Sequence, residues 1–264
     1  MEIHYHQTPL TWWLDKLNKR FGLPDYKELI ILFWYMSSWK TEFSYFVARK
    51  NAEKWNPVCI ISLELPEYEM KLRIARKKAG VSKYDFQTWR YNETQKDIMN
   101  KAFKEIDDIK NLAIISIDDK QLWTIENTIR SYYDSWYRFF IIDNLDKIAP
   151  DRNEDENHRY QRITSTLQDL KNESNLCLML IHHAKKPDWK WTYNRAGMSG
   201  MRWSQKIMDN ATQVFEIYRD LDPESWEKDA VEIIQLKDTF EGNNGSVEIY
   251  FFRWNYYDER IQSF

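Results

Sequence analysis

Short apolar runs alternate with longer charged stretches along this chain of 264 residues. The runs are apolar at nearly every position and cover residues 29–33, 57–63, 112–117, 137–142 and 176–181. Strands that are apolar without alternation are buried on both faces, which is typical of parallel sheets. The stretches between the runs favour helices at 41–54, 66–80, 92–107, 123–134 and 157–173. We therefore expect an α/β fold with a mainly parallel sheet sandwiched by helices.

The last third of the chain predicts a different strand arrangement. Three further strands, at 214–218, 231–236 and 247–253, follow one another without long helical stretches between them. The sequence Glu241-Gly242-Asn243-Asn244-Gly245 between the last two is rich in turn residues. We expect these strands to form an antiparallel hairpin at the edge of the sheet.

Composition excludes several classes of protein. The net charge is −3, so any contact with nucleic acid must come from a local patch. Cys59 and Cys177 both lie inside apolar runs and indicate buried thiols in a reducing compartment. No apolar run approaches the roughly 18 residues of a membrane span, and the N-terminus is not a signal peptide. We expect a soluble, cytoplasmic protein without membrane contact.

The octet after the first apolar run has the frame of a phosphate-binding loop, G-x-x-x-x-G-K-[ST]. It consists of Trp34, Tyr35, Met36, Ser37, Ser38, Trp39, Lys40 and Thr41. In such a loop backbone N–H groups bind the phosphates, the lysine reaches the β- and γ-phosphates, and the hydroxyl binds magnesium. The octet thus predicts ATP and Mg²⁺ as cofactors. Tryptophan stands at both glycine places, however, and an indole at Trp39 would occupy the position of the nucleotide.

Glycine and tryptophan are both present in unusual numbers. The chain has 13 Trp and 6 Gly, although about 7% Gly, or about 18 residues, is ordinary for this length. Several tryptophans, including Trp55, Trp189 and Trp226, lie in polar turn sequences where glycine is expected. Our hypothesis is that UGA codons meaning glycine were read as tryptophan. The alternative is a Trp-rich protein with a degenerate loop, and UGG codons at positions 34 and 39 would establish it.

Two carboxylates follow apolar runs, where α/β sheets place ligand sites. Asp143 comes about 100 residues after the loop and suits the second magnesium-positioning group of a P-loop ATPase. Glu64 ends the run after the loop helix and suits the general base that activates water. In isolation Asp143 reads as a strand end, and Glu64 as a helix N-cap or a surface salt bridge.

His182 and His183 end the fifth run. A metal site is a poor interpretation, because adjacent residues on a strand point in opposite directions and no further His or Cys cluster is near. We interpret His183 as a polar sensor of the γ-phosphate. The alternative is that one histidine is packed and the other solvated.

These motifs together resemble the ATPase domain of DnaB-type replicative helicases, among the RecA-like ATPases. The resemblance runs from about residue 11 to 264, and its segments are 28–41, 61–65, 141–145, 180–183 and 201–211. It implies that Glu64 is the catalytic base and that Lys237, on a hairpin, reaches the nucleotide of a neighbouring subunit. It also implies a homo-oligomer, a hexameric ring, which acts on single-stranded DNA with replication partners.

The chain departs from that family in two respects. Thr239 stands where the hairpin's arginine finger is expected, so Lys237 would act alone or with Arg253. The N-terminal helical domain of the replicative helicases is not expected here. We predict a single RecA-like ATPase domain at 1–264, in which 1–27 is a lead-in segment.

The segment after the two histidines is the best candidate for DNA contact, because it is basic and turn-rich. Its candidate residues are Lys185, Lys186, Lys190, Arg195 and Arg202. An ordinary solvated loop is the alternative. The function expected overall is an ATP-dependent helicase or translocase. A RepA-like or KaiC-like ATPase that remodels a partner, and a catalytically dead binding module, remain as alternatives.

Overall fold

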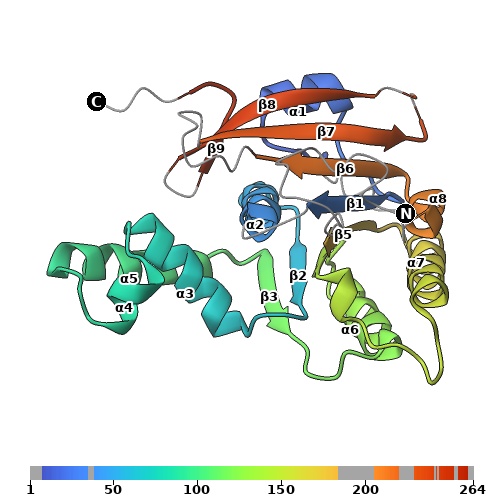
Figure 1. Cartoon of the computed structure of the whole chain (residues 1–264), viewed down its shortest axis with the longest axis horizontal. Coiled ribbons are helices and arrows are strands. Elements are labelled where there is room, and N and C mark those ends of the chain that lie inside the picture. Colours follow the sequence, from blue (N-terminus) through green and yellow to red (C-terminus); the bar gives the residue numbers. More distant parts are fainter. Residues whose placement is uncertain are drawn as a thin grey trace, which may run out of the picture.

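A nine-stranded mixed sheet with helices on both faces forms the fold (Figure 1). The computed structural model describes residues 8–34, 39–183, 205–219, 229–240, 242, 244–252 and 255–260, without the side chains of residues 34, 39, 40, 205 and 206. The strand order within these residues is β3-β2-β4-β5-β1-β6-β7-β8-β9. Strands far apart in the sequence are therefore neighbours at the centre of the sheet.

The five predicted apolar runs form the parallel half of the sheet. They are β1 (Leu29–Trp34), β2 (Val58–Ser62), β3 (Leu112–Ser116), β4 (Phe139–Asp143) and β5 (Cys177–His183). All pairings among them are parallel, and every residue of β2 and β4 is buried. Burial on both faces accounts for the unbroken apolar sequences. The predicted α/β fold is confirmed.

Two apolar layers lie on opposite faces of the sheet. Ile30 and Leu32 of β1 belong to the layer that packs against α1 (Asp15–Phe21), α2 (Trp39–Ala52) and α3 (Glu67–Lys78). Ile31 and Phe33 belong to the layer under α6 (Leu122–Asp134), α7 (Glu156–Glu173) and α8 (Gln205–Asn210). Successive residues of a strand point to opposite faces, so a single strand supplies both layers.

A small helical group extends from one end of the sheet. It comprises α3, α4 (Lys83–Gln87) and α5 (Glu93–Asp107), which lie together in Figure 1, away from β7 and β8. Its own apolar cluster joins α3 to α5 through residues such as Ala75, Met99 and Ala102. The short helix α4, capped by Ser82, was not predicted from the sequence.

The antiparallel edge is larger than the predicted hairpin. β6 (Gln213–Tyr218) runs parallel to β1, and β7 (Ala230–Asp238), β8 (Gly245–Phe252) and β9 (Asn255–Tyr257) continue antiparallel. Residues expected only as a lead-in contribute to the core here. The rings of Trp12 and Phe21 pack edge-on against Phe215, with centroids 5.0 and 5.3 Å away. The N-terminal segment is therefore an integral part of the domain.

Tryptophan occupies several left-handed backbone positions. Among the described residues, the non-glycine residues with positive φ are Trp13 (66°), Lys27 (65°), Trp55 (68°), Trp89 (58°), Trp136 (73°) and Asn153 (60°). Asparagine tolerates this conformation, whereas a bulky residue there is an outlier. Trp55 and Trp89 are also 78% and 79% exposed, so burial of the indole does not offset the strain.

A buried carboxyl group lies just before β1, at the edge of the sheet opposite the end of β1 that leads into the octet. Glu28 is 3% exposed and accepts hydrogen bonds from the Asp25 amide and the Gln213 side chain, each at 3.0 Å. Burial raises the pKa of Glu28 to about 7.

In the part of the chain that is described, no helix is long and apolar enough to cross a membrane.

Candidate nucleotide site

The carboxyl ends of four parallel strands are aligned at one edge of the sheet. Asp143 of β4 pairs in register with Ser62 of β2 on one side and with Ile181 of β5 on the other. On the far side of β5, Trp34 of β1 pairs with His183. This register brings the turn after β2, the end of β4, the histidines and the start of the octet to the same edge, where α/β sheets bind ligands.

The predicted magnesium-positioning residues are in contact. Thr41, in the first turn of α2, donates its hydroxyl hydrogen bond to Asp143 Oδ2 at 2.8 Å. Asp143 is 6% exposed. A hydroxyl oxygen and a carboxylate oxygen side by side are hard ligands of the kind that Mg²⁺ prefers, with water and phosphate completing its octahedron. The residues present therefore fit a magnesium ion.

The predicted general base is held by a residue that sequence reasoning missed. Asn144, fully buried, donates from Nδ2 to Glu64 Oε2 at 2.8 Å. The acceptor is a carboxylate, so the amide nitrogen must face it. Pro66 is the N-cap of α3, so Glu64 does not cap that helix, and Glu64 forms no ion pair with the other described residues. The Glu64 side chain is exposed at this edge of the sheet, and its orientation is set by Asn144, which directly follows β4.

Asn144 also carries a second polar atom that can receive a hydrogen bond. Its Oδ1 is buried and accepts no hydrogen bond from the described residues. A buried acceptor of this kind is costly unless a ligand or water satisfies it. Asn144 therefore donates to the Glu64 carboxylate and carries a second buried polar atom, Oδ1, beside the same candidate base.

His182 and His183 converge on one carboxylate, contrary to the expectation that they point in opposite directions. Asp146, in the 3-10 turn η1 (Leu145–Lys147), contacts His182 Nδ1 at 2.9 Å and His183 Nδ1 at 3.3 Å. Tyr160 of α7 donates to Asp146 Oδ1 at 2.7 Å. Burial would raise the pKa of Asp146, but hydrogen bonds from His182 and His183 outweigh it and hold the pKa far below its usual range. Among the described residues, no group of three or more His, Cys, Asp or Glu side chains could hold a metal ion.

A buried ion pair next to the loop helix was also missed. Glu42, fully buried, follows Thr41 directly and contacts Arg73 Nη2 at 3.0 Å and Lys77 Nζ, both on α3. Burial lowers the pKa of Lys77. An acidic residue directly after the G-K-T frame, together with a basic helix 30 to 40 residues later, was the available signal.

Lys237 lies at the opposite edge of the sheet from the octet. It pairs with Val214 of β6, which is level with Ile31 near the start of β1. Its ammonium group donates to the carbonyls of Met208 and Asp209 at 2.5 and 3.2 Å, and burial lowers its pKa. This lysine is therefore remote from the nucleotide edge of its own chain. A role at a neighbouring subunit stays a prediction.

Several predicted residues fall outside the described part of the chain. They are Tyr35, Met36, Ser37 and Ser38 of the octet, the side chains of Trp34, Trp39 and Lys40, and the DNA candidates Lys185, Lys186, Lys190, Arg195 and Arg202. Their roles stay predictions.

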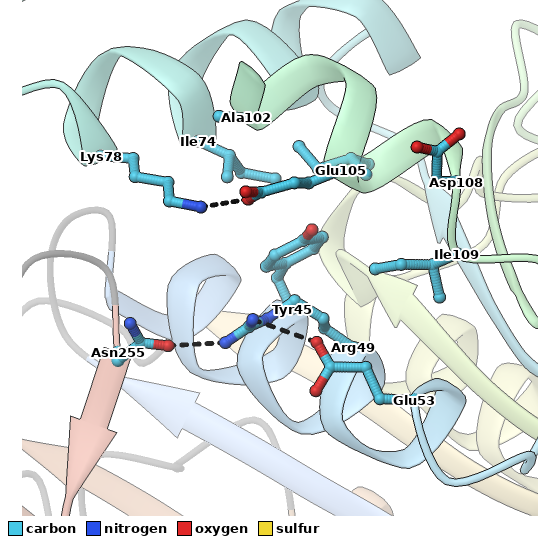
Figure 2. Close-up of a pocket in the computed structure, with 11 residues that line it drawn as sticks. Tyr45, Arg49, Glu53, Ile74, Lys78, Ala102, Glu105, Asp108, Ile109 and Asn255 are labelled. Carbon is cyan, nitrogen blue, oxygen red and sulfur yellow. Dashed lines mark hydrogen bonds and ion pairs between the residues drawn. The ribbon is translucent and has the colours of Figure 1, made fainter. Parts of the chain in front are cut away.

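A separate pocket of about 320 Å³ lies between α2, α5 and β9 (Figure 2). Its cationic side chains are already paired, Arg49 with Glu53 and Asn255, and Lys78 with Glu105. None of the predicted site residues lines it. This pocket is therefore not the nucleotide site.

Comparison with known proteins agrees with this geometry. Two similar solved structures are each 19% identical to this chain. The first is described as an "ATPase Domain" and has a TM-score of 0.82, with 96% of this chain and 92% of that one covered. The second is described as "The Structure Of A DnaB-Like Replicative Helicase And Its Interactions With Primase" and has a TM-score of 0.81, with 95% of this chain and 62% of that one covered. The likeness shows a RecA-like fold.

No curated protein matches the chain. The family model of the DnaB-like helicase C terminal domain matches residues 12–257. That match spans the strands, the octet and the aligned carboxylates described above. The chain belongs to the family of DnaB-like helicase C-terminal domains.

Proposed function

We propose that this protein is a magnesium-dependent ATPase that works as a helicase or translocase on single-stranded DNA. The observation that carries the proposal is the contact of Thr41 with Asp143 beside the Glu64–Asn144 pair. Together these residues offer metal ligands and a general base at one edge of the sheet, next to the octet. Membership of the helicase family supports the substrate class.

Each residue has a separate part in phosphoryl transfer to water. Lys40 binds the β- and γ-phosphates, and Thr41 and Asp143 would hold a magnesium ion, which would neutralise charge on the phosphate oxygens. Glu64 accepts the proton of the water whose oxygen attacks the γ-phosphorus, as the bond to the β-phosphate oxygen breaks. Asn144 keeps that carboxylate oriented. His183 contacts the γ-phosphate end of the nucleotide.

Glycine at positions 34 and 39 of the native product is part of this proposal. The support is the left-handed backbone at Trp13, Trp55, Trp89 and Trp136, a conformation that glycine adopts without strain. Tryptophan thus stands at glycine-type positions well away from the octet. Misread UGA codons would explain these positions and the loop together.

A ring of identical subunits, with DNA at the basic residues between 185 and 202, completes the proposal. Lys237 would then serve the nucleotide of the adjacent subunit, because it lies at the edge opposite its own octet. Replication proteins are the expected partners. One of the similar structures concerns a helicase and its interactions with primase, which makes a primase a specific candidate.

The test is ATP hydrolysis, with and without single-stranded DNA, by the double variant Trp34→Gly/Trp39→Gly. We expect DNA-stimulated, magnesium-dependent hydrolysis that Lys40→Ala abolishes, and little activity in the chain as printed. An inactive double variant, or activity unaffected by Lys40→Ala, would overturn the proposal that the protein is an ATPase. Hydrolysis without strand displacement would favour the remodelling ATPase instead.

A further inference from the structure

Asp146 is a second carboxylate at the nucleotide edge, with partners distinct from those of Asp143. It lies three residues after Asp143, in η1, and its oxygens divide between two groups. Oδ1 contacts His182 Nδ1 and accepts from Tyr160, whereas Oδ2 contacts His183 Nδ1 and accepts from the His183 backbone N–H at 2.9 Å. Asp143 instead faces Thr41. The two aspartates therefore have different tasks.

The contacts of Asp146 define the protonation pattern of both rings. An ionised carboxylate only accepts hydrogen bonds, so a proton on each Nδ1 is the arrangement that suits these contacts of 2.9 and 3.3 Å. A histidine that is neutral and protonated on Nδ1 keeps a bare lone pair on Nε2. The low pKa of Asp146 supports its ionised form. Nε2 is then the remaining polar atom of each ring.

Burial separates the two histidines. His182 is 5% exposed and stands edge-on to the Tyr160 ring, with centroids 5.3 Å apart. The side chain of His183 is 43% exposed and pairs in register with Trp34, the first residue of the octet. His182 and Tyr160 therefore brace the carboxylate from inside, and His183 presents an accessible ring beside the phosphate loop.

The geometry points to Asp146 as a positioning residue that fixes His183 in its Nδ1–H form, with Nε2 left to meet the nucleotide or its water. Oriented this way, neutral His183 accepts at Nε2 from the attacking water. The proton of that water passes to Glu64, as in the proposed function. The catalytic consequence rests on the proposed function, but the tautomer itself does not.

The first experiment reads the tautomers directly in the chain as printed. Long-range ¹H–¹⁵N spectra of ¹⁵N-histidine protein, recorded where the rings are neutral, should show His182 and His183 protonated on Nδ1. His182→Gln and His183→Gln assign the signals. Asp146→Asn should move His183 to the Nε2–H pattern, because the amide nitrogen can donate to Nδ1. His158, which contacts Asp155 instead, should be unchanged.

Control variants separate positioning from folding. Asp146→Glu retains the charge and should keep the Nδ1–H pattern, and Tyr160→Phe removes one bond to Oδ1 without altering the His183 contacts. An Nε2–H pattern for His183 in the unaltered chain, or spectra unaffected by Asp146→Asn, would overturn the assignment. An Asp146→Asn protein that does not fold leaves the unaltered spectrum as the decisive measurement.

The second experiment measures catalysis in the Trp34→Gly/Trp39→Gly background. Asp146→Asn should lower kcat about tenfold or more while KM for ATP changes less than about twofold, and Asp146→Glu should restore part of kcat. Unchanged kcat in Asp146→Asn would overturn the catalytic role. If the parent double variant hydrolyses no ATP, the proposed function is overturned. The assignment of the tautomer is not affected, because the spectra test it independently.

Discussion

The side-chain amide of Asn144 donates a hydrogen bond to the Glu64 carboxylate across 2.8 Å, joining the end of β4 to the turn after β2. Asn144 is fully buried while Glu64 is exposed, so a side chain fixed in the interior orients one at the surface. A general base must lie within hydrogen-bond reach of the proton it removes. In the proposed function, the pair therefore links the sheet to the placement of the attacking water.

Replacing Glu64 should reduce catalysis more than replacing Asn144. In the Trp34→Gly/Trp39→Gly background, Glu64→Gln should lower kcat about 100-fold or more, because the amide cannot accept the proton. Asn144→Ala should lower kcat about fivefold, because the carboxylate stays but loses its tether. Steady-state kinetics with nucleotide affinities checks both. Equal activity of Asn144→Ala and its parent would contradict the tether.

Removal of magnesium should affect nucleotide binding only while Thr41 and Asp143 are intact. In the same background, we expect EDTA to weaken ATP binding about tenfold, or about 1.4 kcal/mol. Thr41→Ala and Asp143→Asn should bind ATP with that weaker affinity whether or not magnesium is present. Calorimetric titrations with and without Mg²⁺ measure the difference. If Mg²⁺ still strengthened ATP binding about tenfold in both variants, other residues would hold the metal.

Glycine should stabilise the protein more than alanine does at the left-handed tryptophans. At positions 55, 89 and 136 we expect the Trp→Gly variant to have a free energy of unfolding about 1 kcal/mol higher than that of the Trp→Ala variant. The reason is that a residue with a Cβ atom is strained at positive φ. Both variants remove the indole, so lost packing cancels in the comparison. Urea titrations supply the values.

Trp123 provides the matched control for that series. It is 61% exposed but lies in α6, where the backbone is right-handed. Trp123→Gly should therefore be less stable than Trp123→Ala, the reverse order. The same order at position 123 and at the left-handed positions would mean that φ does not decide these stabilities.

Glu28 should make stability depend on pH. Its folded pKa is raised to about 7 from 4.5, so the native state holds a proton that the unfolded chain releases at lower pH. The stabilisation is fully present below about pH 4.5 and is lost as pH rises through 7, by at most about 3 kcal/mol at 1.36 kcal/mol per pKa unit. Glu28→Gln should flatten this slope in urea titrations from pH 5 to 8. An equal slope in both proteins would assign the effect to other groups.

Sequence reasoning succeeded where the succession of apolar runs and charged stretches carries the information. The apolar runs became β1 to β5, and the carboxylates after two of those runs, Glu64 and Asp143, were placed at the same edge because parallel strands align their ends. Short elements were missed. Both α4 and β9 are too short to show a period, and their positions depend on packing against α5 and β8.

The supporting residues of the site could not be predicted in the same way. Asn144, Asp146 and Glu42 act through partners 80, 36 to 37 and 31 to 35 residues away in the chain, and only the sheet order brings those partners together. The side chains of His182 and His183 were expected to point in opposite directions, because neighbouring residues of a regular strand do so. Both rings instead turn to Asp146 at the end of β5, where pairing with β1 continues but pairing with β4 has ended at Ile181.

The buried bonds of Glu42 have a mechanical consequence. Glu42 belongs to the first turn of the loop helix, and its partners Arg73 and Lys77 belong to α3, which shares an apolar cluster with α5. Because a buried charge cannot be left alone without a large cost, α2 and α3 must shift together. A tilt of α2 would therefore carry with it α3 and the helical group of α3, α4 and α5 that extends from one end of the sheet (Figure 1).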